Sequence, residues 1–196
     1  MGIMEDDPYL NTGLEIDLLE QPQFTDLQNL EGMKRAAVLV PLFLDAHGWE
    51  ILYTRRSESV QHHKGQVSFP GGAVDENDNG PVSTALREAN EEINIEKAAV
   101  KISGFLPDVV SITDYVITPV VGVLGSLKDV QIRSHEVDRI FSVPLLFFAE
   151  ISNSYIQERI LPSGTRIQIP FYKEYRGELV WGITAQITRE LIQRIK

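Results

Sequence analysis

One segment of the chain, Pro81–Ile93 (PVSTALREANEEI), has the periodicity of an amphipathic helix and constrains the fold more than any other. Proline suits the first position of a helix, and Asn79 or Gly80 can serve as its N-cap. At 100° per residue, five apolar side chains gather on one face. They are Val82, Ala85, Leu86, Ala89 and Ile93. This face predicts a helix that packs on a sheet.

Short apolar runs of β type supply that sheet. The runs 36–44 and 49–56 are joined by a turn at His47-Gly48, which predicts an antiparallel hairpin. Further strands are expected at 65–72, 100–106, 115–124 and 140–145, with a second hairpin across 155–169 and a last helix from about 183. The pattern predicts a single α/β domain with a mixed sheet over residues 33–196. An acidic extension, residues 1–32, precedes it, with one short helix expected near 14–19.

Composition excludes several classes of protein. The longest apolar run, Ala36–Leu44, has nine residues and contains a proline, whereas a spanning helix needs about 20. The first residues, MGIMEDDPYL, lack a secretory pattern, and the absence of cysteine excludes disulfides and zinc–thiolate sites. We therefore expect a cytoplasmic protein. A net charge of −10 argues against nucleic acid as a partner, so an anionic ligand would need a bound cation.

Three glutamates share one arc of the predicted helix. With Glu88 at 0°, Glu91 falls at about −60° and Glu92 at about +40°. Like charges at this spacing repel by roughly 0.2–0.5 kcal/mol per pair. The arc is either a solvated acidic face or a site for a divalent cation. With no cysteine and four histidines, a magnesium-type oxygen site is favoured over zinc.

The residues around this helix resemble the Nudix box, G-x5-E-x7-R-E-U-x-E-E-x-G-U, where U is aliphatic. The stretch REANEEINI (87–95) fits every position except the glycine, which is Asn94 here. Asn is the usual substitute where a helix ends in a left-handed conformation. Asp78 replaces the family's first glutamate, and eight residues rather than seven separate it from Arg87.

The resemblance implies a fold, a metal and a set of roles. The fold is the Nudix α/β/α sandwich with a mixed β-sheet and a loop–helix–loop motif. Glu88, Glu91 and Glu92 would bind Mg²⁺ or Mn²⁺, and one of them would deprotonate the attacking water. Arg87 would brace the loop against Asp78 or its neighbours, the alternative being a surface ion pair. Gly71 and Gly72 would bring the loop backbone close to a metal or phosphate, or simply make a tight turn.

The segment before the box, LYTRRSESVQHHKGQVSFPGG (52–72), resembles the signature of coenzyme A pyrophosphatases, L-L-T-x-R-S-x3-R-x3-G-x3-F-P-G-G. It departs at Tyr53 and Gln61. Arg55, Arg56 and Lys64 are the nearest candidate cations in the sequence for substrate phosphates, including the 3′-phosphate of coenzyme A. The implied reaction cleaves coenzyme A, or a derivative, to 4′-phosphopantetheine (or its acyl form) and adenosine 3′,5′-bisphosphate. Alternatives are another nucleoside diphosphate derivative, such as NADH or ADP-ribose, and a non-catalytic Nudix-fold binding module.

Two further residues carry open interpretations. Trp181 either stacks on a nucleobase or anchors the core. Glu136 joins the metal site, acts as a base from a loop, or is a solvated loop residue. The expected partner is a small-molecule substrate, without nucleic acid or membrane, and the oligomeric state is left open, a homodimer included.

Overall fold

Strand β1 (Lys34–Asp45) is the centre of the sheet in the computed structural model, which describes residues 14–22, 32–59, 63–161 and 163–196. It forms the predicted antiparallel hairpin with β2 (Gly48–Arg56) and pairs in parallel with β7 (Tyr115–Leu124). The remaining strands of this eight-stranded sheet are β3 (Val67–Ser68), β4 (Gly71–Ala73), β5 (Val100–Phe105), β6 (Val109–Val110) and β8 (Val137–Pro144). The sheet is therefore mixed, as predicted.

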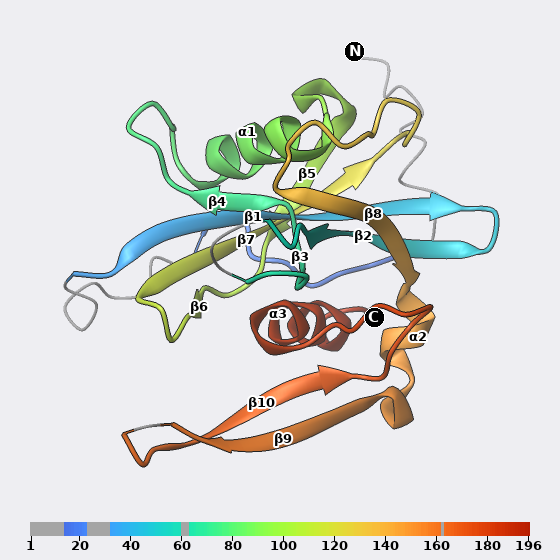
Figure 1. Ribbon diagram of the computed structural model, residues 1–196. Helices are drawn as coiled ribbons and strands as arrows, with labels where there is room; N and C mark the ends of the chain where they lie inside the picture. The colour runs from blue at the N-terminus through green and yellow to red at the C-terminus, as the bar shows by residue number, and fades with distance from the viewer. Residues whose placement is uncertain (1–13, 23–31, 60–62, 162) are drawn as a thin grey trace.

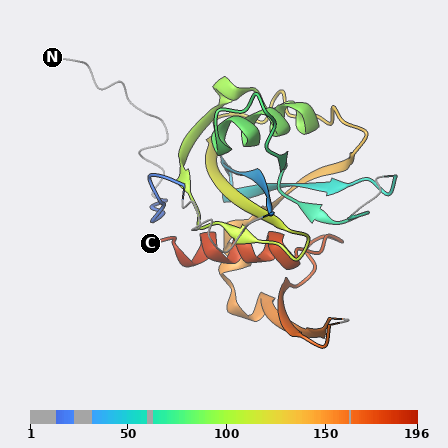
Figure 2. The ribbon, with the colours of Figure 1, turned by 90° about the vertical axis from the view of Figure 1, so that its left-hand side faces the viewer.

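Alternation along β1 builds two apolar layers. Ala37 and Leu39 pack with the apolar side chains of helix α1 (Pro81–Ile93), whereas Val40 and Leu42 pack with those of helix α3 (Gly182–Gln193). The two helices cover opposite faces of the sheet (Figures 1 and 2). The α/β/α sandwich is thus confirmed.

Helix α1 has the bounds that its sequence predicts. Gly80 is the N-cap with φ 99°, and the helix ends at Asn94, whose φ of 59° and ψ of 32° are left-handed. The amide Nδ2 of Asn94 donates to the carbonyl oxygen of Asp129 at 2.7 Å. Asn94 therefore supplies the backbone conformation that glycine supplies in the family pattern, and adds a side-chain contact that glycine lacks.

Helix α3 ties the other face of the sheet to a separate hairpin. Its Thr188 hydroxyl lies 2.8 Å from the hydroxyl of Tyr53 in β2, and Thr184 Oγ1 donates to the carbonyl of Val67 at 3.0 Å. The hairpin of β9 (Ser154–Ile160) and β10 (Arg166–Tyr172) lies beyond α3 (Figure 1). Trp181 stacks on Phe171 of this hairpin at 5.5 Å between ring centroids. Its ring is half-buried and is not part of the buried core, so both interpretations of Trp181 stay predictions.

Three expectations about secondary structure are wrong in part. Residues 14–19 form no helix: they are extended, with bridges from Ile16 to Ile195 and from Leu19 to Phe105. The stretch 65–72 contains two very short strands, β3 and β4, rather than one. Helix α2 (Leu145–Ala149) and the 3₁₀ turns at Lys97–Ala99 and Ile151–Asn153 were not expected. Within the described ranges, no helix is long and apolar enough to span a membrane.

Candidate active site

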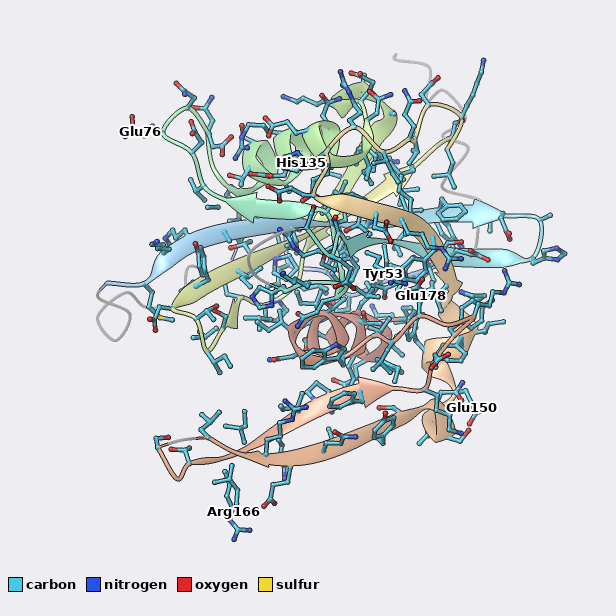
Figure 3. The ribbon with its side chains drawn as sticks, viewed as in Figure 1. Tyr53, Glu76, His135, Glu150, Arg166 and Glu178 are labelled. Atoms are coloured by element: carbon cyan, nitrogen blue, oxygen red, sulfur yellow. The ribbon has the colours of Figure 1, made fainter. Side chains whose placement is uncertain are left out.

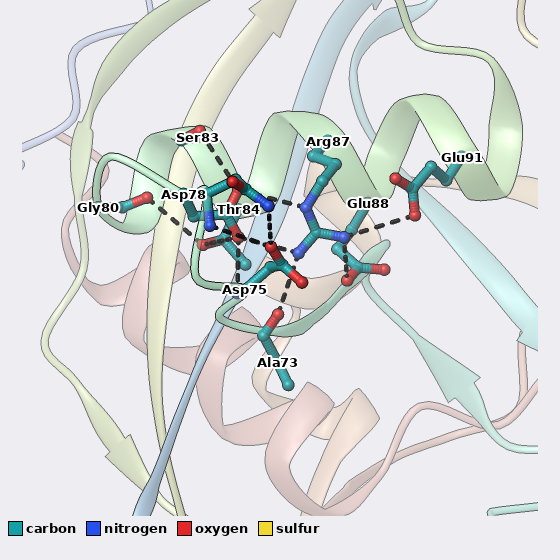
Figure 4. Close-up of polar contacts among 10 residues, drawn as sticks. Ala73, Asp75, Asp78, Gly80, Ser83, Thr84, Arg87, Glu88 and Glu91 are labelled. Carbon is teal, nitrogen blue, oxygen red and sulfur yellow. Dashed lines mark hydrogen bonds and ion pairs between the residues drawn. The ribbon is translucent and has the colours of Figure 1, made fainter.

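Arg87 and Asp78 join the middle of α1 to the loop that precedes the helix (Figure 4). Arg87 Nη2 donates to Asp78 Oδ2 at 2.9 Å and Nε donates to Oδ1 at 3.2 Å, which makes the pair bidentate. The Asp78 side chain is only 3% exposed. Hydrogen bonds from Arg87 hold the pKa of the Asp78 carboxyl far below its usual range. The predicted brace is present, and it is an enclosed pair rather than a surface one.

The same guanidinium also reaches the carboxylates of α1. Nη1 of Arg87 donates to Glu88 Oε1 at 2.7 Å and to Glu91 Oε2 at 3.4 Å, while Nη2 donates to the carbonyl of Ala73 at 3.1 Å. Asp78 in turn accepts a hydrogen bond from the Thr84 hydroxyl at 2.9 Å. Arg87 therefore positions the loop and the carboxylates together, although the loop is one residue longer than in the family pattern.

Glu92 is the most enclosed carboxylate of the helix. It is 7% exposed, and its Oε2 is buried without a hydrogen-bond partner in the described part of the chain. Burial raises the pKa of Glu92 to about 8; Arg56 opposes this rise, whereas Glu88 and Glu136 add to it. A buried carboxylate oxygen without a partner is costly unless a proton or a cation satisfies it. This oxygen fits a bound divalent cation.

Glu88 lies against the glycines of β4. Burial raises its pKa above the ordinary value, and Arg87 opposes that rise. A Cβ placed on Gly72 would lie 2.5 Å from the carboxyl carbon of Glu88, and one placed on Gly71 would lie 2.5 Å from the carbonyl oxygen of Ala37. Gly72 thus leaves room for the Glu88 side chain, and Gly71 leaves room for the backbone of β1. The approach of these glycines to a metal or a phosphate stays a prediction.

The third glutamate of the arc, Glu91, is the most exposed of the three. Its side chain is 59% exposed and faces Arg87; it is a charged neighbour of Glu88, which is in turn a charged neighbour of Glu92. Among the residues that the structure describes, no three acidic or histidine side chains converge on a common point that could hold a metal. The metal-binding roles of Glu88, Glu91 and Glu92 therefore stay predictions.

Arg56 and Glu136 bring two further charges to this face. Arg56 Nη2 donates to Glu136 Oε2 at 2.9 Å, and both residues are among the charged neighbours of Glu92. Glu136 is a loop residue, and its carboxylate lies beside the carboxylates of α1. Residue spacing alone could not place it, because it comes from a loop 44 positions beyond Glu92.

Arg55 points to the other face of the sheet. Its Nη1 lies 3.7 Å from Glu178 Oε1, and its Nε lies 4.0 Å from Asp138 Oδ2. Neighbouring residues of a strand point to opposite faces, so Arg55 and Arg56 do not share one phosphate from the same side of the sheet. Lys64 is exposed in the turn after the hairpin, and Gln61 lies outside the described residues.

A braced carboxylate helix on a mixed sheet, with a buried carboxylate oxygen suited to a cation, fits the class of hydrolases that depend on a divalent metal. The model of the NUDIX domain matches residues 33–152. The chain is 39% identical over 164 residues to a protein of Escherichia coli named uncharacterized Nudix hydrolase NudL, covering 83% of each. A protein of the same name from Photorhabdus laumondii is 38% identical over 163 residues, or 83% of this chain and 86% of that one. The chain belongs to the Nudix hydrolase family.

Solved structures agree on the fold. An Ap4A hydrolase from C. elegans, in a binary complex, has a TM-score of 0.50 and 27% identity, over 57% of this chain and 80% of that one. A MutT/nudix family protein from Enterococcus faecalis has a TM-score of 0.58 and 14% identity, over 92% of this chain and 64% of that one. The second likeness concerns the fold alone.

Proposed function

We propose that this protein hydrolyses the pyrophosphate bond of coenzyme A or one of its derivatives. The products are 4′-phosphopantetheine, or its acyl form, and adenosine 3′,5′-bisphosphate, and Mg²⁺ or Mn²⁺ is required. A cytoplasmic location is part of the same proposal. The observation that carries it is the signature over residues 52–72, which supplies Arg56, whose guanidinium lies among the charged neighbours of the Glu92 carboxylate.

The reaction places water on a phosphorus atom that negative oxygens already surround. A divalent cation, when bound, neutralises that charge and lowers the pKa of its water. Glu88, Glu91 and Glu92 would hold the cation, and Arg87 keeps Glu88 in place from the loop side. A carboxylate oxygen that does not hold the cation accepts the proton from the attacking water; the candidates are one of these three glutamates and the half-exposed Glu136. Arg56 contacts a substrate phosphate after leaving Glu136.

A second candidate substrate is another nucleoside diphosphate derivative, such as NADH or ADP-ribose. The likeness to a structure titled as an Ap4A hydrolase, at 27% identity, favours a dinucleotide of this kind. A non-catalytic binding module is disfavoured because Glu88, Glu91 and Glu92 are all retained.

A substrate panel tests the proposal. The purified protein is incubated with Mg²⁺ and coenzyme A, acyl-coenzyme A, 3′-dephospho-coenzyme A, NADH, ADP-ribose or Ap4A, and the products are separated by chromatography. We expect coenzyme A to be cleaved at least about tenfold more efficiently than its 3′-dephospho form, the scale of one charge-assisted contact. Faster cleavage of NADH, ADP-ribose or Ap4A than of every coenzyme A derivative would show that the assignment to coenzyme A is wrong.

A further inference from the structure

A buried carboxylate on the α3 face of the sheet gathers two arginines. The Glu178 side chain is 4% exposed; its Oε1 accepts a hydrogen bond from Arg139 Nη1 at 2.7 Å and lies 3.7 Å from Arg55 Nη1. Figure 3 shows Glu178 between β8 and α3, in the same region as Tyr53. The carboxylate fixes both guanidinium groups at one end of β8.

A cavity of about 220 Å³ opens beside this carboxylate, and we call it the edge cavity. It is lined by Arg139, Phe141, Ser142, Tyr175, Arg176 and Glu178. Pockets that enclose a complete drug-sized ligand have volumes of about 300–1,000 Å³. The edge cavity is smaller, so it suits one end of a longer ligand.

The charges at the edge cavity favour an anion. Arg139 and Arg176 line the cavity with two positive charges, against the one negative charge of Glu178. Arg55 and Asp138, which lie outside the lining, are paired at 4.0 Å and add no net charge. Arg55 Nε is buried and has no hydrogen-bond partner among the described residues. A local positive surplus in a chain with a net charge of −10 marks a place where an anionic group is stabilised.

Two aromatic rings favour a planar group beside that anion. Tyr175 and Phe141 both line the cavity. The Tyr175 ring is held in place by Phe147, at 4.9 Å between ring centroids, and the Arg176 guanidinium lies 5.2 Å from its centre. Aromatic side chains with arginines beside them suit a nucleobase that carries a phosphorylated sugar.

The edge cavity lies close to the carboxylates of α1, around the border of the sheet. In register, Arg55 is opposite Arg139 and Arg56 is opposite Val137. Two residues of a strand span only about 7 Å. Within the described sheet β8 pairs with β2 alone, so its outer edge is open. An extended ligand with its pyrophosphate at Arg56 can therefore pass this edge and reach the cavity.

We propose that the edge cavity binds the phosphorylated nucleoside end of the substrate. The base lies against Tyr175 and Phe141, and the sugar phosphate contacts Arg139 and Arg176. This inference rests on the proposed function, because it takes coenzyme A, with its adenosine 3′-phosphate, as the substrate. It reassigns the 3′-phosphate from Arg55, Arg56 and Lys64 to residues that the signature does not contain. Arg55 then acts as a positioning residue that holds Glu178.

The test is titration calorimetry of adenosine 3′,5′-bisphosphate without metal, on the native protein and three variants. Arg139→Gln and Arg176→Gln each remove one positive charge from the cavity, and Arg176→Gln leaves both partners of Glu178 in place. Arg166→Gln is the matched control, since Arg166 is 73% exposed on the hairpin, far from Glu178 in Figure 3. We expect each cavity variant to bind the bisphosphate about tenfold more weakly, and the control to bind as the native protein does.

Kinetics with coenzyme A separate this inference from the proposed function. The cavity variants should raise KM about tenfold and leave kcat within roughly twofold, because the contacts are made to the nucleoside end of the substrate and not to the reacting phosphorus. Unchanged bisphosphate affinity in Arg176→Gln, or equal weakening in all three variants, overturns the inference while native cleavage of coenzyme A leaves the function standing. If the native protein cleaves no coenzyme A, the function is wrong, and bisphosphate binding still decides the cavity.

Discussion

Gly72 and Glu88 are in such close contact that a methyl group on the glycine would lie 2.5 Å from the carboxyl carbon of the glutamate. The conflict would fall on the free end of a side chain. Gly72→Ala should therefore displace the Glu88 carboxylate, weaken Mn²⁺ binding about tenfold and change the melting temperature little. Calorimetry and thermal unfolding measure the two effects.

Gly71→Ala is the matched comparison. Its added methyl group would lie 2.5 Å from the carbonyl oxygen of Ala37 and 2.6 Å from the Cα of Val38, which belong to the backbone of β1. We expect this variant to lose about 1–3 kcal/mol of stability. Equal melting temperatures for the two alanine variants would contradict this difference between a clash with a side chain at Gly72 and a clash with the backbone at Gly71.

Glu92→Gln should weaken Mn²⁺ binding strongly and nearly abolish turnover while α1 stays folded. The neutral amide keeps the shape of the side chain but removes a charge that a buried cation needs. Glu158→Gln is the control, because the Glu158 side chain is 52% exposed on the β9–β10 hairpin, beyond α3 (Figure 1). If calorimetry gave native Mn²⁺ affinity for Glu92→Gln, this carboxylate would not be a ligand.

The stability of the metal-free protein should fall as the pH rises toward 8. Burial raises the pKa of Glu92 to about 8 in the folded state, whereas an unfolded glutamate titrates near about 4.3. Between these values the folded state binds more protons than the unfolded state, so stability declines through this window and levels off above it. Thermal unfolding in chelator should show this decline in Glu91→Gln and a reduced decline in Glu92→Gln.

Asp78→Asn should destabilise the protein by about 1–3 kcal/mol near neutral pH, since it weakens the bidentate pair with Arg87. Arg87 lowers the pKa of Asp78, so this stabilisation is complete above the usual aspartate range and is lost as the pH falls below it. Urea titrations at several pH values should show the native protein approaching the variant only in acid. A gap that persists there would point to packing rather than charge.

Asn94 tests the end of α1. Its left-handed conformation favours glycine, but Nδ2 donates to Asp129 and Oδ1 accepts from Arg133 Nη1 at 3.0 Å. In Asn94→Gly the backbone gain offsets the lost hydrogen bonds, whereas Asn94→Val loses both and should be about 1 kcal/mol or more less stable than the glycine variant. Chemical denaturation that ranked valine equal to glycine would refute this account.

Arg56→Gln should raise the affinity for Mn²⁺ and lower the catalytic efficiency. Arg56 is a cation beside Glu92 and Glu136, so its loss should strengthen Mn²⁺ binding in the absence of substrate. The same loss should lower kcat/KM for coenzyme A by about tenfold or more, since a phosphate contact disappears. Weaker Mn²⁺ binding in the variant would mean that Arg56 serves chiefly to hold Glu136 as a ligand.

Local pattern was sufficient for the parts of the site that lie close in sequence. The period of Pro81–Ile93 predicted the helix to the residue, and the position of Asn94 predicted its left-handed end. The brace between Arg87 and Asp78 spans nine positions of one loop–helix unit. In such a unit, short-range geometry decides which side chains meet.

Contacts between segments that are distant in the sequence could not be predicted from local pattern. Glu178 meets Arg55 and Arg139 because a turn after β10 lies under β8, and nothing in its local sequence marks it as buried. Residues 14–18 alternate apolar and polar side chains as a strand does, and residues 15–19 exchange backbone hydrogen bonds with the end of the chain after α3 and with β5. The opposite directions of Arg55 and Arg56 were predictable, because adjacent residues of a strand alternate.

The parallel pairing of β1 with β7 has a consequence for how this enzyme acquires its activity. Lys34 is opposite Tyr115, so 80 residues lie between these partners, and α1 is part of that connection. Closing so long a loop is slow, because its entropic cost is not offset until the non-local contacts form. Because α1 packs on both β1 and β7, the helix that carries the carboxylates is fully placed only when these two strands have paired. In refolding experiments, recovery of Mn²⁺ binding should follow the same time course as closure of the sheet, with no earlier phase.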